Sequence, residues 1–327
     1  MKYRDLGKTG FKVSELSFGT WAIGGAWGST NDTEALKGLE YAMSQGVNFF
    51  DTADVYGDGH AEELLAKATK GKEQEIHVAS KFCRAGDIHD PETYSEGKVR
   101  EFLEASLRRL GREQMDLYQI HCPPKEIIKN GDVFEVLDKL QQEGKIRNYG
   151  VSVETAEEGL LAMENKNVST LQVIFNIFRQ KPARELFSAA QEKEVGILAR
   201  VPLASGLLTG KFKENHIFEE DDHRRFNADG QAFNVGETFA GLPFNTGVTL
   251  SRELEWITEG RGNMARAALK WILEHEAVSA VIPGFKREEQ VQDLLQTQEA
   301  KEFSKEEMEK LKSFYDNQVH DNIRGPY

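Results

Sequence analysis

Residues 76–121 read IHVASKFCRAGDIHDPETYSEGKVREFLEASLRRLGREQMDLYQIH. The two ends of this stretch, 76–81 and 115–121, are short and largely apolar, as expected of buried strands. Between them, apolar residues recur at every third or fourth position over 99–107, which predicts an amphipathic helix. A buried strand, a helix and a second buried strand form the unit from which parallel sheets are built.

The same alternation of apolar runs and amphipathic segments extends along the whole chain. We expect strands at residues 16–19, 48–51, 76–81, 115–121, 146–151, 171–175, 196–200 and 280–283. Eight strands with helices between them favour an α/β fold of the closed (β/α)8, or TIM barrel, type over a doubly wound sheet. A doubly wound dinucleotide-binding sheet carries G-x-G-x-x-G after its first strand, whereas this chain reads GTWAIGG at 19–25. We expect residues 1–327 to form one barrel domain.

Three segments lie outside the repeating units. Residues 3–6 and 11–13 flank a Gly-Lys-Thr-Gly turn, which predicts an N-terminal hairpin that caps one end of the barrel. Residues 211–250, after the seventh strand, lack periodicity and predict a long loop. We interpret this loop as a cover over the active site, with an ordinary surface insertion as the alternative. Residues 304–315 predict a last helix with a serine cap.

Composition argues against several classes of function. The 327 residues are 39% hydrophobic and 29% charged, a globular balance. The net charge of −13 argues against general affinity for nucleic acid or anionic membranes, because both would repel an acidic surface. No apolar run resembles a signal peptide or reaches the roughly 18 residues of a membrane span, so we expect a cytoplasmic protein. The only cysteines, Cys83 and Cys122, suit neither a disulfide framework nor a metal site.

Ionisable residues stand at the ends of three neighbouring strands. The second, third and fourth predicted strands end in Asp51, Lys81 and His121, and Tyr56 lies on the loop after Asp51. Taken singly, Asp51 could cap a turn, His121 could be an ordinary buried histidine, and Tyr56 could serve packing. Lys81 is harder to explain without a buried anion beside it. Together the four residues favour one polar site at the mouth of the barrel.

These side chains suit the reduction of a carbonyl group. Hydride arriving at a carbonyl carbon leaves charge on the oxygen, so an acid must donate a proton. Tyr56 can be that acid if the ammonium group of Lys81 lowers its pKa, while Asp51 holds the lysine by a charge-assisted hydrogen bond. His121 can donate a hydrogen bond to the carbonyl oxygen and orient it.

The motifs that carry these residues resemble signatures of the aldo-keto reductase family. They are FFDTADVYG at 49–57, ASK at 79–81 and DLYQIH at 116–121. The opening YRDLGKTG, with LSFGTW at 16–21, looks like the start of the family, and LLTGK at 207–211 resembles its bacterial, potassium-channel-β-like branch. The resemblance spans nearly the whole chain. It implies a catalytic tetrad of the four residues above and a nicotinamide cofactor.

The resemblance also implies where that cofactor, NADP(H), would lie. Ser152 and Gln172 would bind the carboxamide, and Arg200 replaces a tyrosine that commonly stacks on nicotinamide. Small residues after the seventh strand would approach the diphosphate, and Lys286 with Arg287 would bind the 2′-phosphate. The residues expected to bind the cofactor are Thr20, Trp21, Asp51, Ser152, Gln172, Arg200, Pro202, Leu203, Ser205, Gly206, Leu207, Lys211, Gly284, Lys286, Arg287, Gln290 and Asp293.

The expected partner is a small carbonyl compound, bound by Trp21, Trp27, Tyr56 and His121, in a monomer or weak homo-oligomer. Two other functions remain open. Lys81 could form a Schiff base in an aldolase, although Asp51 would keep it charged. A cofactor-sensing regulatory subunit is the second, because the family includes channel-associated proteins that carry the same tetrad.

Overall fold

The computed structural model describes residues 1–25 and 27–327. Within them, eight parallel strands form one sheet whose spatial order follows the chain from β3 to β10. The strands are β3 (Phe18–Gly19), β4 (Phe49–Asp51), β5 (His77–Phe82), β6 (Met115–His121), β7 (Ile146–Ser152), β8 (Thr170–Ile174), β9 (Gly196–Arg200) and β10 (Val278–Val281). The sheet closes because Leu16 pairs with Val281, and Gly19 with Gly284. The prediction of a closed (β/α)8 barrel is confirmed.

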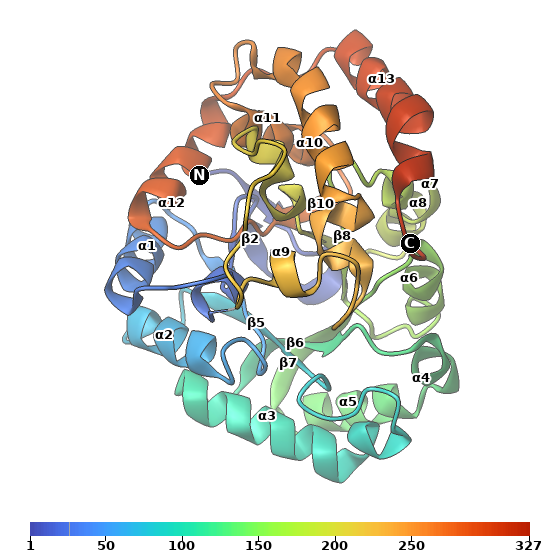
Figure 1. The fold of residues 1–327 in the computed structure, drawn as a ribbon. Helices are drawn as coiled ribbons and strands as arrows, with labels where there is room; N and C mark the ends of the chain where they lie inside the picture. The colour runs from blue at the N-terminus through green and yellow to red at the C-terminus, as the bar shows by residue number, and fades with distance from the viewer. Residues whose placement is uncertain (26) are drawn as a thin grey trace.

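Helices between the strands surround the barrel, as Figure 1 shows. They are α1 (Asp32–Ser44), α2 (His60–Thr69), α3 (Glu96–Leu110), α4 (Lys125–Asn130), α5 (Asp132–Gln142), α6 (Ala156–Ala162), α7 (Lys181–Glu185), α8 (Phe187–Glu192), α11 (Met264–Leu273) and α12 (Glu288–Leu295). The helix α3 shows why such segments form. Ser95 accepts the amide of Lys98 at its start, Gly111 ends it in a left-handed conformation, and its apolar face is buried against the sheet.

The hairpin predicted at the N-terminus is confirmed. The strands β1 (Tyr3–Asp5) and β2 (Lys12–Ser14) pair in antiparallel fashion. Leu6, Phe11 and Val13 belong to a small apolar cluster, together with side chains of the barrel strands such as Phe49 and Leu117. The hairpin therefore fills the amino-terminal end of the barrel, and the polar site is confined to the other end.

The predicted bounds of the last strand are wrong by two residues. The strand β10 begins at Val278, not at residue 280, and ends at Val281. A register shift between Val278 and Ala280 obscures the alternation in the sequence. Pro283, which the prediction included, has no amide hydrogen with which to extend the ladder.

The loop predicted at 211–250 is shorter than expected, because α10 (Phe244–Glu253) includes its last seven residues. In this helix Gly247 lies against Leu207, where a Cβ atom would come within 2.4 Å of a methyl carbon. We call residues 211–243 the lid loop. It contains α9 (His223–Phe226) and two short 3-10 turns, and α9 overlies the centre of the barrel in Figure 1.

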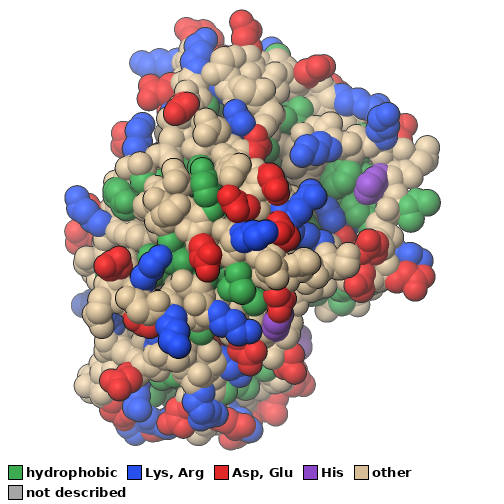
Figure 2. Space-filling view, turned by 90° about the vertical axis from the view of Figure 1, so that its left-hand side faces the viewer, with side chains coloured by type: hydrophobic (Ala, Val, Ile, Leu, Met, Phe, Trp, Pro, Cys, Tyr) green, Lys and Arg blue, Asp and Glu red, His purple; other side chains and the backbone are tan. Residues whose placement is uncertain are grey.

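The last predicted helix is confirmed as α13 (Lys305–Phe314), in which Ser304 and Glu307 form a capping box. Acidic and basic side chains are interspersed over the face shown in Figure 2. Among the described residues, no helix has both the length and the apolar character that a membrane span requires.

Candidate active site

Lys81 is the centre of the polar cluster at the barrel mouth. Its Nζ atom lies 2.5 Å from Asp51 Oδ1, 2.9 Å from the carbonyl oxygen of Thr52 and 3.2 Å from the hydroxyl oxygen of Tyr56. Lys81 is fully buried, and burial by itself lowers the pKa of an ammonium group. The negative charge of Asp51 and the hydrogen bonds outweigh that effect, so the pKa of Lys81 is raised and the side chain is charged.

Tyr56 is held against this lysine by a close approach of two loops. Gly57 has φ +64°, and a Cβ atom there would lie 2.2 Å from the carbonyl oxygen of Gly24. Burial raises the pKa of Tyr56, and the opposing effect of Lys81 only partly offsets it. The expectation that Lys81 lowers the pKa of Tyr56 below its ordinary value is therefore wrong for the free protein, because desolvation of the phenolate is the larger effect. Tyr56 is a protonated phenol at neutral pH.

His121 lies edge-on to Tyr56, with ring centroids 5.8 Å apart. Burial, together with the nearby charges of Arg84, Lys81 and Arg200, lowers the pKa of His121 well below its usual value. The imidazole is therefore neutral and has one N–H to donate.

Gln172 contacts the carboxylate of Asp51. Its Nε2 atom donates to Asp51 Oδ2 at 2.8 Å, and Gln119 donates to the same oxygen at 3.3 Å. These two amides and Lys81 orient the buried carboxylate. Gln172 also lines the cavity described next.

A cavity of about 370 Å³ opens above the cluster and extends to the start of α12. Most residues predicted to bind substrate or cofactor line it. They are Trp21, Trp27, Asp51, Tyr56, His121, Gln172, Arg200, Pro202, Leu203, Ser205, Gly206, Lys211, Gly284, Lys286 and Gln290. Side chains distant in the sequence thus meet in one cavity at the carboxyl ends of the strands.

Five predicted cofactor ligands lie outside the cavity wall. Thr20 is fully buried, and the hydroxyl oxygen of Ser152 faces the Cys122 thiol at 3.4 Å. Leu207 packs in the core beside Gly247. The other two lie on or beside α12. Asp293 forms an ion pair with Arg266 at 2.5 Å, and Arg287 is exposed.

The backbone amides expected to bind phosphate are largely in use. Around Ser205, the amides of Ala204 and Gly206 donate to carbonyl groups within the same turn. At the start of α12, Gln290 Oε1 accepts from the amides of Lys286 and Arg287 at 2.7 and 3.1 Å. These amides already have hydrogen-bond partners, so side-chain cations are the positively charged groups to consider at this end of the cavity.

Besides Arg200, three cations line the cavity, namely Lys211, Arg224 and Lys286. Arg224, from α9, was not anticipated. Its guanidinium is fixed by Asp222, with N–O distances of 2.9 and 2.5 Å, and lies 4.9 Å from the ring centroid of Trp27. The sequence offers no signal for Arg224, because only the folding of the lid loop brings it over the barrel.

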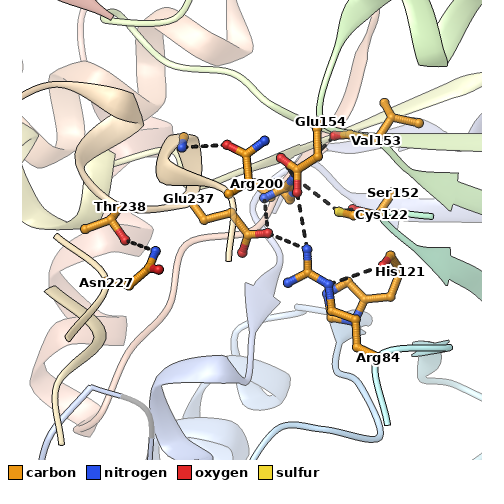
Figure 3. A network of polar contacts seen from close by, with 12 residues as sticks. Arg84, His121, Cys122, Ser152, Val153, Glu154, Arg200, Asn227, Glu237 and Thr238 are labelled. Carbon is orange, nitrogen blue, oxygen red and sulfur yellow. Dashed lines mark hydrogen bonds and ion pairs between the residues drawn. The ribbon is translucent and has the colours of Figure 1, made fainter. Parts of the chain in front are cut away.

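Arg200 belongs to a network of buried charges at the edge of the cavity, shown in Figure 3. It donates to Glu154 Oε2 at 3.2 Å and to the carbonyl oxygen of Val153 at 3.2 Å, and it lies 3.8 Å from Glu237 Oε1. Sequence analysis missed Glu154 and Glu237. With Cys122 they could in principle ligate a metal ion, since their ligand atoms lie within 4.8 Å of one another. Guanidinium groups already balance the charge of the two carboxylates, so no metal cation is needed to neutralise them.

Asp54, between Asp51 and Tyr56, is a buried carboxyl group with an altered pKa. Burial and the nearby Glu62 raise the pKa of Asp54 to about 7. A carboxyl whose pKa is raised on folding favours the folded state below its unfolded value near 4, and this contribution is lost as pH rises through about 7. We therefore expect Asp54→Asn to stabilise the protein by about 2–4 kcal/mol at pH 8 but not at pH 4.

Thermal or urea unfolding at the two pH values measures this effect. Asp58→Asn is the matched control, because Asp58 lies on the same loop and is exposed. An equal gain at both pH values for Asp54→Asn would show that the carboxyl group does not titrate as the burial of Asp54 implies.

Comparison with known proteins agrees with this geometry. The model of the Aldo/keto reductase family matches residues 15–316. The aldo-keto reductase YhdN of Bacillus subtilis is 30% identical over 302 residues, which cover 90% of this chain and 88% of that protein. The holo form of aldo-keto reductase AKR11C1 from Bacillus halodurans has a TM-score of 0.75 and 26% identity, and covers 100% of this chain and 98% of its own. Glycerol dehydrogenase AKR11B4 from Gluconobacter oxydans has a TM-score of 0.76 and 28% identity, with 99% and 98% coverage.

The family model spans most of the chain, the barrel superposes on solved members over almost its full length, and the motifs seen in the sequence meet around one cavity. The chain belongs to the aldo/keto reductase family.

Proposed function

We propose that the protein is an NADP(H)-dependent oxidoreductase that reduces an aldehyde or ketone to an alcohol, with Tyr56 as the proton donor. The observation that carries this proposal is the position of Lys81, which contacts both Asp51 and Tyr56 beneath a cavity that continues to three cations. One end of the cavity thus has an acid for the carbonyl oxygen, and the other has positive charge for phosphate groups.

The side chains around Tyr56 have separate tasks in this proposal. A bound reduced nicotinamide supplies the hydride that reaches the carbonyl carbon. Tyr56 donates its phenolic proton to the carbonyl oxygen, and the ammonium group of Lys81 stabilises the phenolate that remains. The neutral His121 donates a hydrogen bond to the same oxygen and sets its direction. Asp51 keeps Lys81 charged throughout.

An aromatic wall faces this acid. The Trp21 ring stacks on Tyr56 with centroids 6.1 Å apart, and Trp27 meets Trp21 edge-on at 5.5 Å. These rings favour a substrate with an apolar or planar body. The neighbour from Gluconobacter oxydans is named a glycerol dehydrogenase, so alcohol oxidation by the same groups is the reverse reaction to assay alongside reduction.

The preference for NADPH rests on the cations at the far end of the cavity. Lys286 lines the cavity, and its ammonium group donates to the carbonyl oxygens of Trp27 and Ser29. Arg287 is exposed and does not line the cavity. Within the pair identified in the sequence, Lys286 is therefore the residue we assign to the 2′-phosphate.

We expect Lys286→Ala to weaken NADPH binding about 10- to 100-fold, as for loss of a charge-assisted hydrogen bond to phosphate. Binding of NADH should change little, because NADH lacks that phosphate. Fluorescence titration of both nucleotides measures this, with Arg287→Ala as the matched control. An equal loss of binding affinity for NADPH and NADH would show that Lys286 acts only by holding the loop at Trp27. If the wild type bound neither nucleotide, the proposed oxidoreductase function would be wrong.

A further inference from the structure

Four charged side chains from four separate segments, all largely shielded from solvent, meet beside His121 (Figure 3). Arg84 follows β5, Glu154 follows β7, Arg200 ends β9, and Glu237 belongs to the lid loop. Their side chains are 19%, 12%, 10% and 7% exposed. Glu237 is the only one of the four that the lid loop contributes, so its contacts to the other three depend on the position of that loop.

Arg84 is the link between the lid loop and the catalytic strand. Its Nε atom donates to the carbonyl oxygen of His121 at 3.2 Å. The Nη2 atom of the same guanidinium donates to Glu237 Oε1 at 2.7 Å and to Glu154 Oε1 at 3.2 Å. One rigid, planar group thus holds both the backbone of His121 and the carboxylate of the lid loop.

The backbone near these contacts needs such support. Cys83, Cys122 and Val201 directly follow the strands β5, β6 and β9, and their φ angles are +90°, +54° and +52°. Left-handed conformations are unfavourable for residues with a side chain, above all for a β-branched valine. They persist when surrounding contacts hold them, and Arg84 contacts the residue before Cys122.

The charge balance of this network depends on the position of the lid loop, which contributes Glu237. Burial opposes ionisation of Glu237, but Arg84 and Arg200 outweigh it and lower the pKa of Glu237 to about 2. Burial and the neighbouring Glu237 raise the pKa of Glu154. If the lid loop moves away from the barrel, Glu237 moves with it. Arg84 and Arg200 then have Glu154 as their one remaining counter-ion in this network.

We propose that Arg84 is a positioning residue that couples closure of the lid loop to the placement of His121, with Glu237 as its partner on the loop. This inference rests on the proposed function, because it assigns His121 to the carbonyl oxygen. Closure brings Glu237 to Arg84, and Arg84 then holds the carbonyl group of His121. The loop and the catalytic imidazole therefore reach their working positions together.

The test compares Glu237→Gln, Arg84→Met and the double variant. Hydrogen exchange in the free protein should show about tenfold faster exchange over 211–243 in each variant, since each loses a charge-assisted contact of the loop. With NADPH bound, cofactor dissociation in stopped-flow fluorescence should accelerate by about the same factor. Arg84→Met should in addition lower kcat, with little change in KM for the carbonyl substrate.

The double variant measures the coupling. Its exchange over 211–243 and its cofactor dissociation should be no faster, and its kcat no lower, than those of Arg84→Met alone. Arg84→Lys is the second variant if Arg84→Met fails to fold, because lysine keeps the charge but cannot span His121 and Glu237 at once. Glu307→Gln is the matched control. It removes the carboxylate that lies 2.6 Å from another buried arginine, Arg261, and should leave exchange over 211–243 and cofactor dissociation unchanged.

Additive effects in the double variant, or unchanged exchange over 211–243, would overturn the inference. Exchange in the free protein needs no cofactor, so this result is independent of whether the protein is an NADPH-dependent reductase. A wild type that binds no nicotinamide nucleotide would instead contradict the proposed function.

Discussion

Tyr56→Phe should lower kcat for carbonyl reduction by about 100- to 10,000-fold, the range expected for loss of a general acid. The substitution removes one hydroxyl oxygen, which lies 3.2 Å from Lys81 Nζ, and leaves the ring that stacks on Trp21. Lys81 keeps its contacts with Asp51 and Thr52, so the cluster should stay intact. Cofactor binding should be unchanged, because the loss falls on the transition state.

Steady-state kinetics with an aldehyde and NADPH, together with a fluorescence titration of NADPH, separate these effects. Tyr3→Phe is the matched control. This substitution removes the hydroxyl group that donates to the carbonyl oxygen of Gly46 near the hairpin, far from the cavity. The variant should retain full activity. A near-normal kcat for Tyr56→Phe would show that another group is the acid, and His121 would be the first residue to test.

Lys81→Met should damage both activity and stability. Methionine fills a similar volume but leaves the buried carboxylate of Asp51 without its cation, which destabilises proteins by about 3–5 kcal/mol. It also removes the charge that stabilises the Tyr56 phenolate, so kcat should fall at least as far as in Tyr56→Phe. Adding Asp51→Asn should restore much of the stability without restoring activity, because the unpaired charge is gone but the ammonium group is still absent.

Urea unfolding and kinetics of the single and double variants measure the two effects. Lys270→Met is the matched control, since Lys270 is also largely buried and lies 3.3 Å from Glu274, but it is outside the cavity. A Lys81→Met protein that keeps its activity would contradict the assigned role.

The same lysine distinguishes the proposed reductase from an aldolase. A Schiff base requires an uncharged amine, whereas the contact with Asp51 raises the pKa of Lys81. Borohydride treatment with a carbonyl compound should therefore leave Lys81 unmodified. A reduced adduct on Lys81 would favour the aldolase instead.

Much of the fold follows from local patterns. Each strand is a short apolar run and each helix has a buried face, so counting them is enough to predict the closed barrel. The limits of this reasoning appear where tertiary contacts override local signals. The register shift at β10 hides its first residues, and the burial of Gly247 against Leu207 makes a helix of a segment that reads as a loop.

The candidate site divides in the same way. Asp51, Tyr56, Lys81 and His121 stand at or beside strand ends, and parallel strands bring such positions together by symmetry, so the sequence by itself determines this cluster. The expected lowering of the Tyr56 pKa depends on how far the phenol is desolvated, which no sequence pattern reports.

The path of the lid loop and the positions of its charges were decided by the tertiary structure alone. Arg224 and Glu237 line the cavity from an aperiodic segment, and Arg84 and Glu154 meet Glu237 from segments that follow distant strands. Local periodicity records which face of an element is buried. It carries no information on where a long loop folds back, because that depends on contacts between distant residues, such as Arg84 and Glu237, which are 153 positions apart.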